Sequence, residues 1–101
     1  MKVTRKDNKS GTVLSLEGEL TIYTVAQAKQ SLLEGHENFS PSVSLNLANV
    51  SEIDTAGLQL LLFLQKLLGG SSKKLSVSKS NEHVDSIFKN LDVTSLFALE
   101  N

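Results

Sequence analysis

The chain contains no cysteine among its 101 residues, and this absence excludes both a disulfide framework and a thiolate metal site. Neither positive nor negative charge is in clear excess, because the chain has ten Lys and Arg and eleven Asp and Glu, for a net charge of −1. Neither a nucleic acid nor an anionic membrane surface is therefore an expected partner. Aromatic residues are few, four Phe and one Tyr. Most stand at core-like positions, so stacking on nucleobases has no support.

Long apolar runs are absent as well. The longest block, Leu60 to Leu64, is far shorter than the roughly 20 residues that cross a bilayer. The polar N-terminus has no secretory apolar stretch. We therefore expect a soluble, cytoplasmic protein without direct membrane insertion. The length predicts one domain over residues 1–101, and roughly 60–65% of the unfolded chain's surface is expected to be buried on folding. The sequence predicts no oligomeric state.

The apolar pattern changes between strand and helix periods along the chain. Alternation of apolar and polar residues predicts four strands, at residues 3–5, 12–17, 42–47 and 74–78. Helical spacing predicts three helices, one between Thr24 and Gly35, one from Thr55 to Leu68, and one from Ser80 or Asn81 to Leu91. Strand–helix–strand units form parallel pairs through right-handed crossovers. The predicted fold class is α/β, with a four-stranded, mostly parallel mixed sheet and helices packed mainly on one face.

Several local features follow from residue type. Thr24 is expected to cap the first helix, with Gln27 completing a capping box. Residues 18–23 and 51–54 are expected to be connecting loops. The middle helix has apolar residues on two sides, so we expect it to be the most buried helix. Leu96 and Phe97 are expected to cover one end of the core.

Residue patterns typical of enzymes are missing. His36 and His83 have no second His at ligand spacing, so we expect no metal site. The segment 69–73 is rich in glycine but lacks the order of a phosphate-binding P-loop, and no GxSxG turn is present. We therefore expect a protein without enzymatic activity and without a cofactor.

The residue that could carry a function is Thr55, at the start of the middle helix. Its hydroxyl lies between Asp54 and Gly57, where the first N–H groups of the helix lack intrahelical partners and the helix dipole is positive. A phosphate there would add about −1.5 to −2 charges, which is typical of a switch. The alternative is a plain helix cap at Asp54 or Thr55, worth about 1 kcal/mol.

Three stretches together resemble the STAS family, which includes bacterial anti-sigma factor antagonists. The first is Val50-Ser51-Glu52-Ile53-Asp54-Thr55-Ala56-Gly57-Leu58. The others lie at residues 14–20 and 91–97, so the resemblance covers nearly the whole chain, residues 3–97. It implies a four-stranded sheet covered by helices.

The resemblance also implies a regulatory protein-binding module that is switched by phosphorylation at Thr55. The implied partners are a histidine-kinase-like ATPase, which is an anti-sigma factor kinase, and a phosphatase. The implied contact surface comprises Thr21, Ile22, Tyr23, Thr24, Asp54, Thr55, Ala56, Gly57 and Gln59.

Other members of the family suggest other partners. The Asp54–Leu58 run resembles the STAS subunit of lipid-transport ABC systems, which docks on the ATPase. The segment 18–24 resembles small STAS proteins encoded beside chemotaxis genes, so a chemotaxis adaptor is a further alternative. Thr55 stands where the antagonists usually have Ser, and Thr21 where they often have Asp. Ile22 and Tyr23 either fold back into the core or anchor a partner, and the sequence leaves both open.

Overall fold

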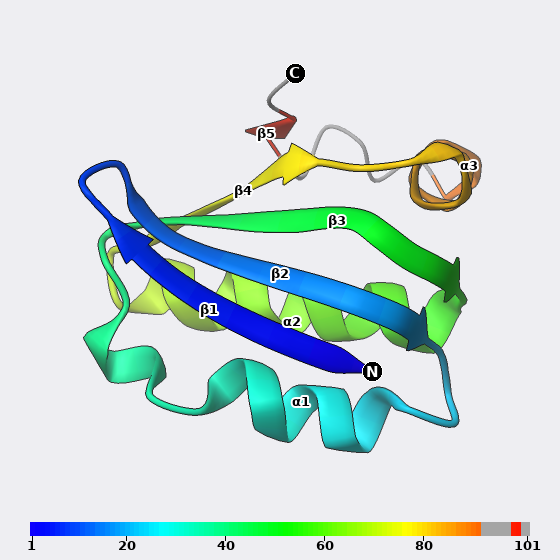
Figure 1. Cartoon of the computed structure of the whole chain (residues 1–101), viewed down its shortest axis with the longest axis horizontal. Coiled ribbons are helices and arrows are strands. Elements are labelled where there is room, and N and C mark those ends of the chain that lie inside the picture. Colours follow the sequence, from blue (N-terminus) through cyan, green and yellow to red (C-terminus); the bar gives the residue numbers. More distant parts are fainter. Residues whose placement is uncertain (92–97, 100–101) are drawn as a thin grey trace.

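A computed structural model describes residues 1–91 and 98–99 of the chain, and its centre is a mixed sheet (Figure 1). The strand order is β1-β2-β3-β4-β5, the same as the order along the chain. The β1–β2 pair is antiparallel and every other pair is parallel. The strands are β1 (Lys2–Asn8), β2 (Gly11–Leu20), β3 (Ser42–Ile53), β4 (Lys74–Lys79) and β5 (Ala98–Leu99). The predicted mixed sheet is confirmed, and the two-residue β5 extends it at one edge.

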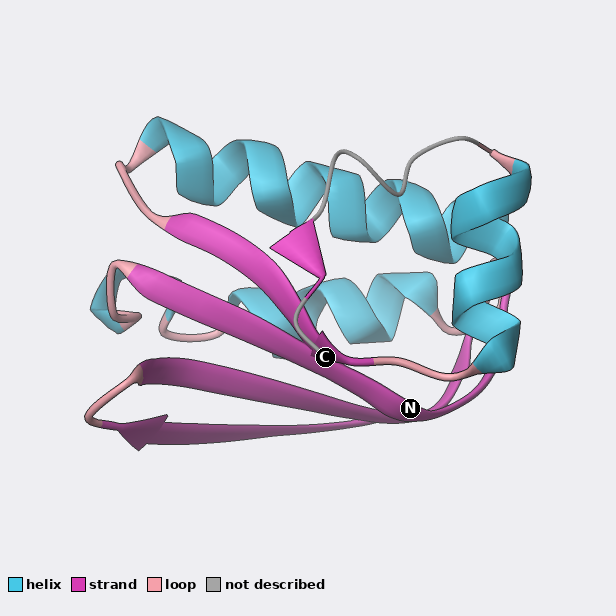
Figure 2. Cartoon of the chain, turned by 90° about the horizontal axis from the view of Figure 1, so that it is seen from above, coloured by secondary structure: helices cyan, strands magenta, loops and turns pink. Residues whose placement is uncertain are grey.

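Two of the helices form a layer against one face of this sheet. Helices α1 (Val25–Leu33) and α2 (Thr55–Gly70) lie side by side below the sheet in Figure 1. Helix α3 (Glu82–Asn90) begins just after β4 and packs against the second half of β3, and Figure 2 shows it crossing the end of the molecule. A short 3-10 helix, η1 (His36–Asn38), links α1 to β3.

The core lies between the sheet and these helices. The three α-helices contribute buried residues, and α2 buries six of them whereas α1 and α3 bury two each. The prediction that α2 is the most buried helix is therefore confirmed. Its second apolar stripe is not fully buried, because 42% of Phe63 is exposed. The Lys29 ammonium lies 4.7 Å from the centroid of the Phe63 ring, so this ring packs under a charged side chain of α1.

The predicted loops at 18–23 and 51–54 were wrong over residues 18–20 and 51–53, which belong to strands. Strand β2 continues to Leu20 and β3 to Ile53. Their pairing shifts register between Ser15 and Glu17 and again between Gly18 and Glu19. Each irregularity breaks the two-residue period from which a strand is recognised. Only residues 21–24 and Asp54 remain to connect these strands to α1 and α2.

The ends of α1 and α3 also differ from expectation. The Thr24–Gln27 capping box does not form, because the Gln27 amide donates to the Met1 carbonyl at 3.3 Å. The sequence also suggests Gly35 as the C-cap of α1, but the structure has another residue there. Glu34 takes that position, and Gly35 follows with a positive φ of 67°. Leu91, which has the spacing of the apolar face of α3, is the C-cap of that helix and is 44% exposed. Leu96 and Phe97 lie outside the described residues.

Candidate protein-binding site

The candidate site lies where β2 and β3 end and α1 and α2 begin, at the right-hand end of Figure 1. Leu20 and Ile53 are paired in register at the ends of the two strands. The Asp54 N–H donates to the Leu20 carbonyl at 3.3 Å. A Cβ on Gly57 would lie only 2.1 Å from the same carbonyl oxygen. The chain therefore needs glycine at position 57 to start α2 against the end of β2.

Asp54 joins the two connecting segments through its carboxylate. Oδ1 accepts a hydrogen bond from the Gly57 N–H at 3.0 Å, and Oδ2 accepts one from the Ile22 N–H at 2.9 Å. Partial burial raises the pKa of this carboxyl, but the backbone N–H groups of Gly57, Ile22, Ala56 and Asp54 itself together outweigh it, and the pKa is lowered overall. Asp54 is thus the N-cap of α2, and as a carboxylate it also fixes a loop that is 32 residues away in the sequence.

The Thr21–Thr24 loop is held by its two threonine hydroxyls. Thr24 Oγ1 accepts from the Thr21 N–H at 3.0 Å and donates to the Glu19 carbonyl at 2.9 Å. Buried Thr21 accepts from the Tyr23 N–H at 3.3 Å. The loop is therefore well anchored, yet Ile22 is 63% exposed and Tyr23 is 93% exposed. These two side chains do not fold back into the core.

The remaining predicted residues lie on the first two turns of α2. Thr55 is the first residue of the helix, and its side chain is exposed and makes no hydrogen bond to any described residue. Gln59, one turn further, is also exposed, whereas Ala56 is half-buried and Gly57 is buried. The nine predicted residues thus gather at one end of the sheet. Thr21 and Gly57 are buried there and hold the loop and the helix start in place. Ile22, Tyr23, Thr55 and Gln59 form an exposed surface.

Sequence reasoning missed the bond that connects the two halves of this site. An Asp before a helix predicts a bond to the N–H of the third helical residue, which Gly57 supplies. Nothing in the local pattern indicates the second bond, to Ile22. The only available signal is the presence of two loops that follow adjacent parallel strands, since such loops meet at one edge of a sheet.

Two other classes of site find no support in the described part of the chain. It contains no group of three or more His, Cys, Asp or Glu side chains that could hold a metal ion. His36 lies 3.3 Å from the Glu37 carboxylate, and His83 is at the start of α3. None of the described helices is both long enough and apolar enough to cross a bilayer.

A comparison with known families identifies the fold. A family model described as "Mlab, STAS domain" matches residues 3–98 of the chain. The chain belongs to the STAS domain family. The anti-sigma-B factor antagonist of Staphylococcus epidermidis is 34% identical to it over 79 residues, which are 78% of this chain and 70% of that protein. The predicted resemblance to anti-sigma factor antagonists is therefore confirmed.

Solved structures of anti-sigma factor antagonists have the same fold. An anti-sigma factor antagonist from Mycobacterium paratuberculosis superposes with a TM-score of 0.86 at 18% identity, covering 98% of this chain and 84% of that one. The Bacillus cell fate determinant SpoIIAA has been solved unphosphorylated and phosphorylated. Its unphosphorylated form gives a TM-score of 0.77 at 16% identity, covering 99% of this chain and 89% of that one. At these identities the structural likeness establishes the fold alone.

Proposed function

We propose that this STAS domain is a regulatory protein-binding module of the anti-sigma factor antagonist type, switched by phosphorylation at Thr55. The observation that carries the proposal is the position of the Thr55 hydroxyl. It is exposed at the start of α2, at the same end of the sheet as Ile22 and Tyr23, the two most exposed large apolar side chains among the described residues. Aromatic side chains in such positions are common binding hot spots.

The partner we propose is a histidine-kinase-like ATPase that binds the unmodified form. This ATPase transfers the γ-phosphoryl group of ATP to the Thr55 hydroxyl oxygen, which releases ADP and a proton. A phosphatase then hydrolyses the phosphate ester and restores the hydroxyl. The relationship to anti-sigma-B factor antagonists supports this cycle, as does the existence of a phosphorylated form of SpoIIAA.

The geometry around Asp54 suggests how the phosphate would act. The Asp54 carboxylate already occupies the Gly57 and Ile22 N–H groups, so those donors are not open to a phosphate. The adjacent negative charge also repels it, and the phosphate is expected to point away from the domain. It would then lie within the partner's footprint, where about −1.5 to −2 additional charges oppose docking without any refolding of the domain.

Two measurements test this function. The first captures partners from native lysate with wild type and with Thr55→Glu, and we expect the ATPase on wild type alone. The second incubates the captured ATPase and ATP with wild type or Thr55→Ala and measures intact mass. One added phosphate on wild type and none on Thr55→Ala is the expected result. Equal phosphorylation of both proteins would move the switch to another residue.

An alternative function is a subunit that docks on the ATPase of a lipid-transport ABC system. The Asp54–Leu58 run and the family model described as "Mlab, STAS domain" favour it. In that case Thr55 contributes to docking but is not modified. Capture of an ABC ATPase, with no phosphate on either protein and with binding still lost in Thr55→Glu, would favour this alternative.

A further inference from the structure

Strand β3 is longer than its neighbour β4, and this difference leaves part of the sheet without a strand beside it. The pairing of β3 with β4 stops at Asn46 and Lys79, whereas its pairing with β2 continues to Ile53. The first turn of α3 takes the place of the missing strand. There the Asn81 amide donates to the carbonyls of Leu47, Ala48 and Val50, at 3.2, 3.0 and 2.8 Å.

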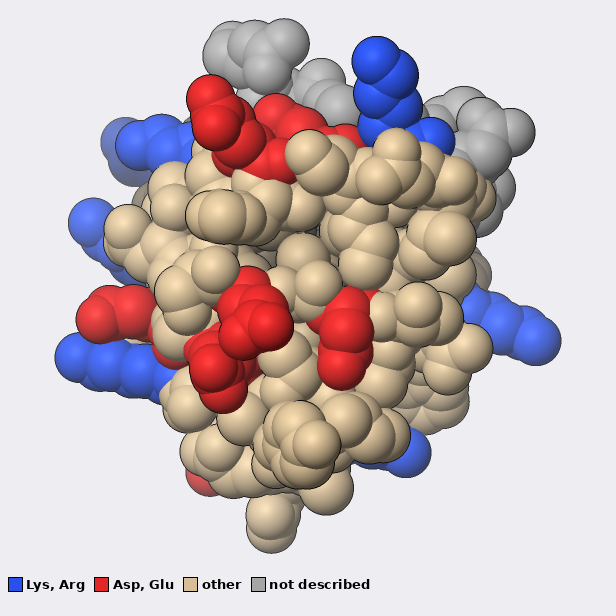
Figure 3. All heavy atoms as spheres, turned by 90° about the vertical axis from the view of Figure 1, so that its right-hand side faces the viewer, with Lys and Arg blue, Asp and Glu red and all other residues tan. Residues whose placement is uncertain are grey.

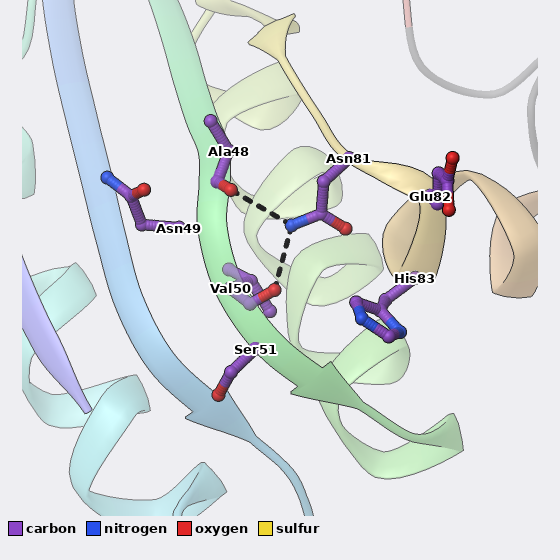
Figure 4. Close-up of a pocket in the computed structure, with 7 residues that line it drawn as sticks. All are labelled: Ala48, Asn49, Val50, Ser51, Asn81, Glu82 and His83. Carbon is purple, nitrogen blue, oxygen red and sulfur yellow. Dashed lines mark hydrogen bonds between the residues drawn. The ribbon is translucent and has the colours of Figure 1, made fainter.

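A recess of about 460 Å³ lies between this part of β3 and the start of α3. Figure 4 shows β3 along one side and His83, Asn81 and Glu82 on the other. Its lining consists of Ala48, Asn49, Val50, Ser51, Asn81, Glu82 and His83. No Lys or Arg lines the recess, and it contains no cluster of metal ligands among the described residues.

One acidic side chain lines this recess, and two more lie next to its lining along β3 and β2. Glu82 lines it, Glu52 follows Ser51 along β3, and Glu19 is in register with Glu52 on β2. All three are exposed, and none of them forms an ion pair with a described residue. Like charges side by side on neighbouring strands are destabilising. Because the net charge of the whole chain is only −1, the negative charge here reflects the gathering of these three Glu residues in one region and not an excess of acidic residues overall.

Figure 3 shows the end of the molecule where β2 and β3 terminate. Asp and Glu side chains gather in the middle of this face, and the Lys and Arg side chains lie at its rim. A ligand that approaches this face therefore meets a negative potential. Nucleic acids and anionic lipid headgroups have the wrong charge for it, whereas Lys and Arg side chains have the complementary charge.

We propose that this recess binds an extended, basic segment of a partner protein. The segment lies along β3 beside α3 and places Lys or Arg side chains against Glu52, Glu82 and Glu19. An extended chain fits because the recess follows the direction of β3 over residues 48–51. This contact does not involve Thr55, so the proposal does not depend on the switch proposed above.

The test titrates the ¹⁵N-labelled full chain with an N-acetylated, C-amidated peptide of six arginines. We expect amide shifts concentrated at residues 48–52 and 81–83. The apparent Kd should rise severalfold when the ionic strength increases from about 25 to about 250 mM, because the contact is between exposed charges. An acetylated hexa-serine peptide should cause no shifts. Absence of shifts with the arginine peptide at low salt, or shifts spread evenly over all acidic residues, would overturn the proposal.

A matched pair of variants separates the recess from general charge attraction. Glu52→Gln and Glu34→Gln each remove one exposed carboxylate, but Glu34 is at the other end of α1 from this face. Glu52→Gln should weaken peptide binding about threefold, and Glu34→Gln should leave it unchanged. Equal effects of the two variants would contradict the site. A final arm uses spermine, and if it reproduced the same shifts at the same affinity, the recess would be a polyamine site and the proposed protein segment would be wrong.

Discussion

Helices α2 and α3 both begin with a side chain that caps the helix and also reaches another part of the fold. Asp54 caps α2 through the Gly57 N–H and accepts from the Ile22 N–H. Asn81 caps α3 through the Val84 N–H and donates to three carbonyls of β3. The more distant partners differ in kind. The partner of Asp54 is an N–H donor, whereas the partners of Asn81 are carbonyl acceptors. A carboxylate can only accept and an amide can do both, so each start has the residue that its surroundings require.

The two starts also differ at the third helical residue. In α3 this residue is Val84, whose side chain is fully buried in the core. In α2 it is Gly57, which touches the end of β2 with its backbone. Helix α3 is thus held by side-chain packing at its start, and α2 by close backbone contact. The close contact lies at the same end of the sheet as the exposed surface of Ile22, Tyr23, Thr55 and Gln59.

The largest expected effect comes from Gly57→Ala. The new Cβ would lie 2.1 Å from the Leu20 carbonyl oxygen, and neither strand end nor helix start can move without breaking hydrogen bonds. We expect a loss of about 3 kcal/mol or more in the free energy of unfolding, at the upper end of overpacking costs. Urea denaturation followed by circular dichroism measures it. The control is Gly69→Ala, where nothing lies within 4 Å of the new Cβ, and a similar loss in both variants would show that the contact is unimportant.

The next largest effect is expected from Asn81→Asp. This change keeps the cap on Val84 but places a carboxylate against the carbonyls of Leu47, Ala48 and Val50. We expect a loss of about 2–3 kcal/mol near neutral pH, because the carbonyls lose their donor and a charge is partly buried. Stability should partly recover in acid, since the protonated carboxyl can donate once. Denaturation midpoints at pH 7 and pH 4 measure this, and an unchanged midpoint at pH 7 would contradict the role of the amide.

A smaller effect is expected from Asp54→Asn. The amide can still cap Gly57 but presents an N–H to the Ile22 N–H, so we expect a loss of about 1 kcal/mol. Amide hydrogen exchange at Ile22 and Tyr23 should accelerate more than exchange elsewhere. Unaltered exchange at Ile22 would show that the hydrogen bond from the Ile22 N–H to Asp54 does not stabilise the loop.

Wild type and Asp54→Asn should also differ in their dependence on pH. Burial raises the pKa of Asp54, but the nearby backbone N–H groups, with those of Gly57 and Ile22 foremost, together outweigh it and lower the pKa. Its contribution to stability is therefore complete above the unfolded-state pKa of about 3.9 and is lost as the pH falls through the lower folded-state value. The pKa of Asp7 is lowered by the Thr12 hydroxyl and by Arg5. Asp7 should therefore contribute stability that is lost in acid, and this contribution should be the same in both proteins. Parallel stability curves for the two proteins below pH 4 would contradict the assignment to Asp54.

The smallest effect on stability is expected from Tyr23→Ala. With 93% of this residue exposed, its removal should change the free energy of unfolding by less than about 0.5 kcal/mol. Binding of the captured partner should nevertheless weaken at least tenfold if Tyr23 is a hot spot. Calorimetric titration of wild type and variant measures the affinity. A large drop in thermal midpoint with intact binding would show that Tyr23 is structural.

The parts of the fold that depend on short-range pattern were predictable from the sequence. The start of α2 at Thr55 and of α3 after Asn81 followed from capping residues before apolar spacing, and the mixed sheet followed from strand–helix alternation. The ends of β2 and β3 were not predictable, because register irregularities move polar residues such as Glu19 and Glu52 out of simple alternation. The second bonds of Asp54 and Asn81 were also hidden, since each joins residues more than 30 positions apart.

The order of the strands has a consequence for how the chain folds. Each strand of the sheet lies beside the strand that precedes it in the sequence, so no strand has to wait for one that comes later than its next neighbour. Only the antiparallel β1–β2 pair is local, since the parallel pairs β2–β3 and β3–β4 each span a helical crossover, as in Thr12 with Val43, and such pairing is slower. During synthesis, the β1–β2 hairpin can form first and offer an edge to β3, and β3 in turn offers one to β4. The sheet can therefore grow in the direction in which the ribosome delivers it.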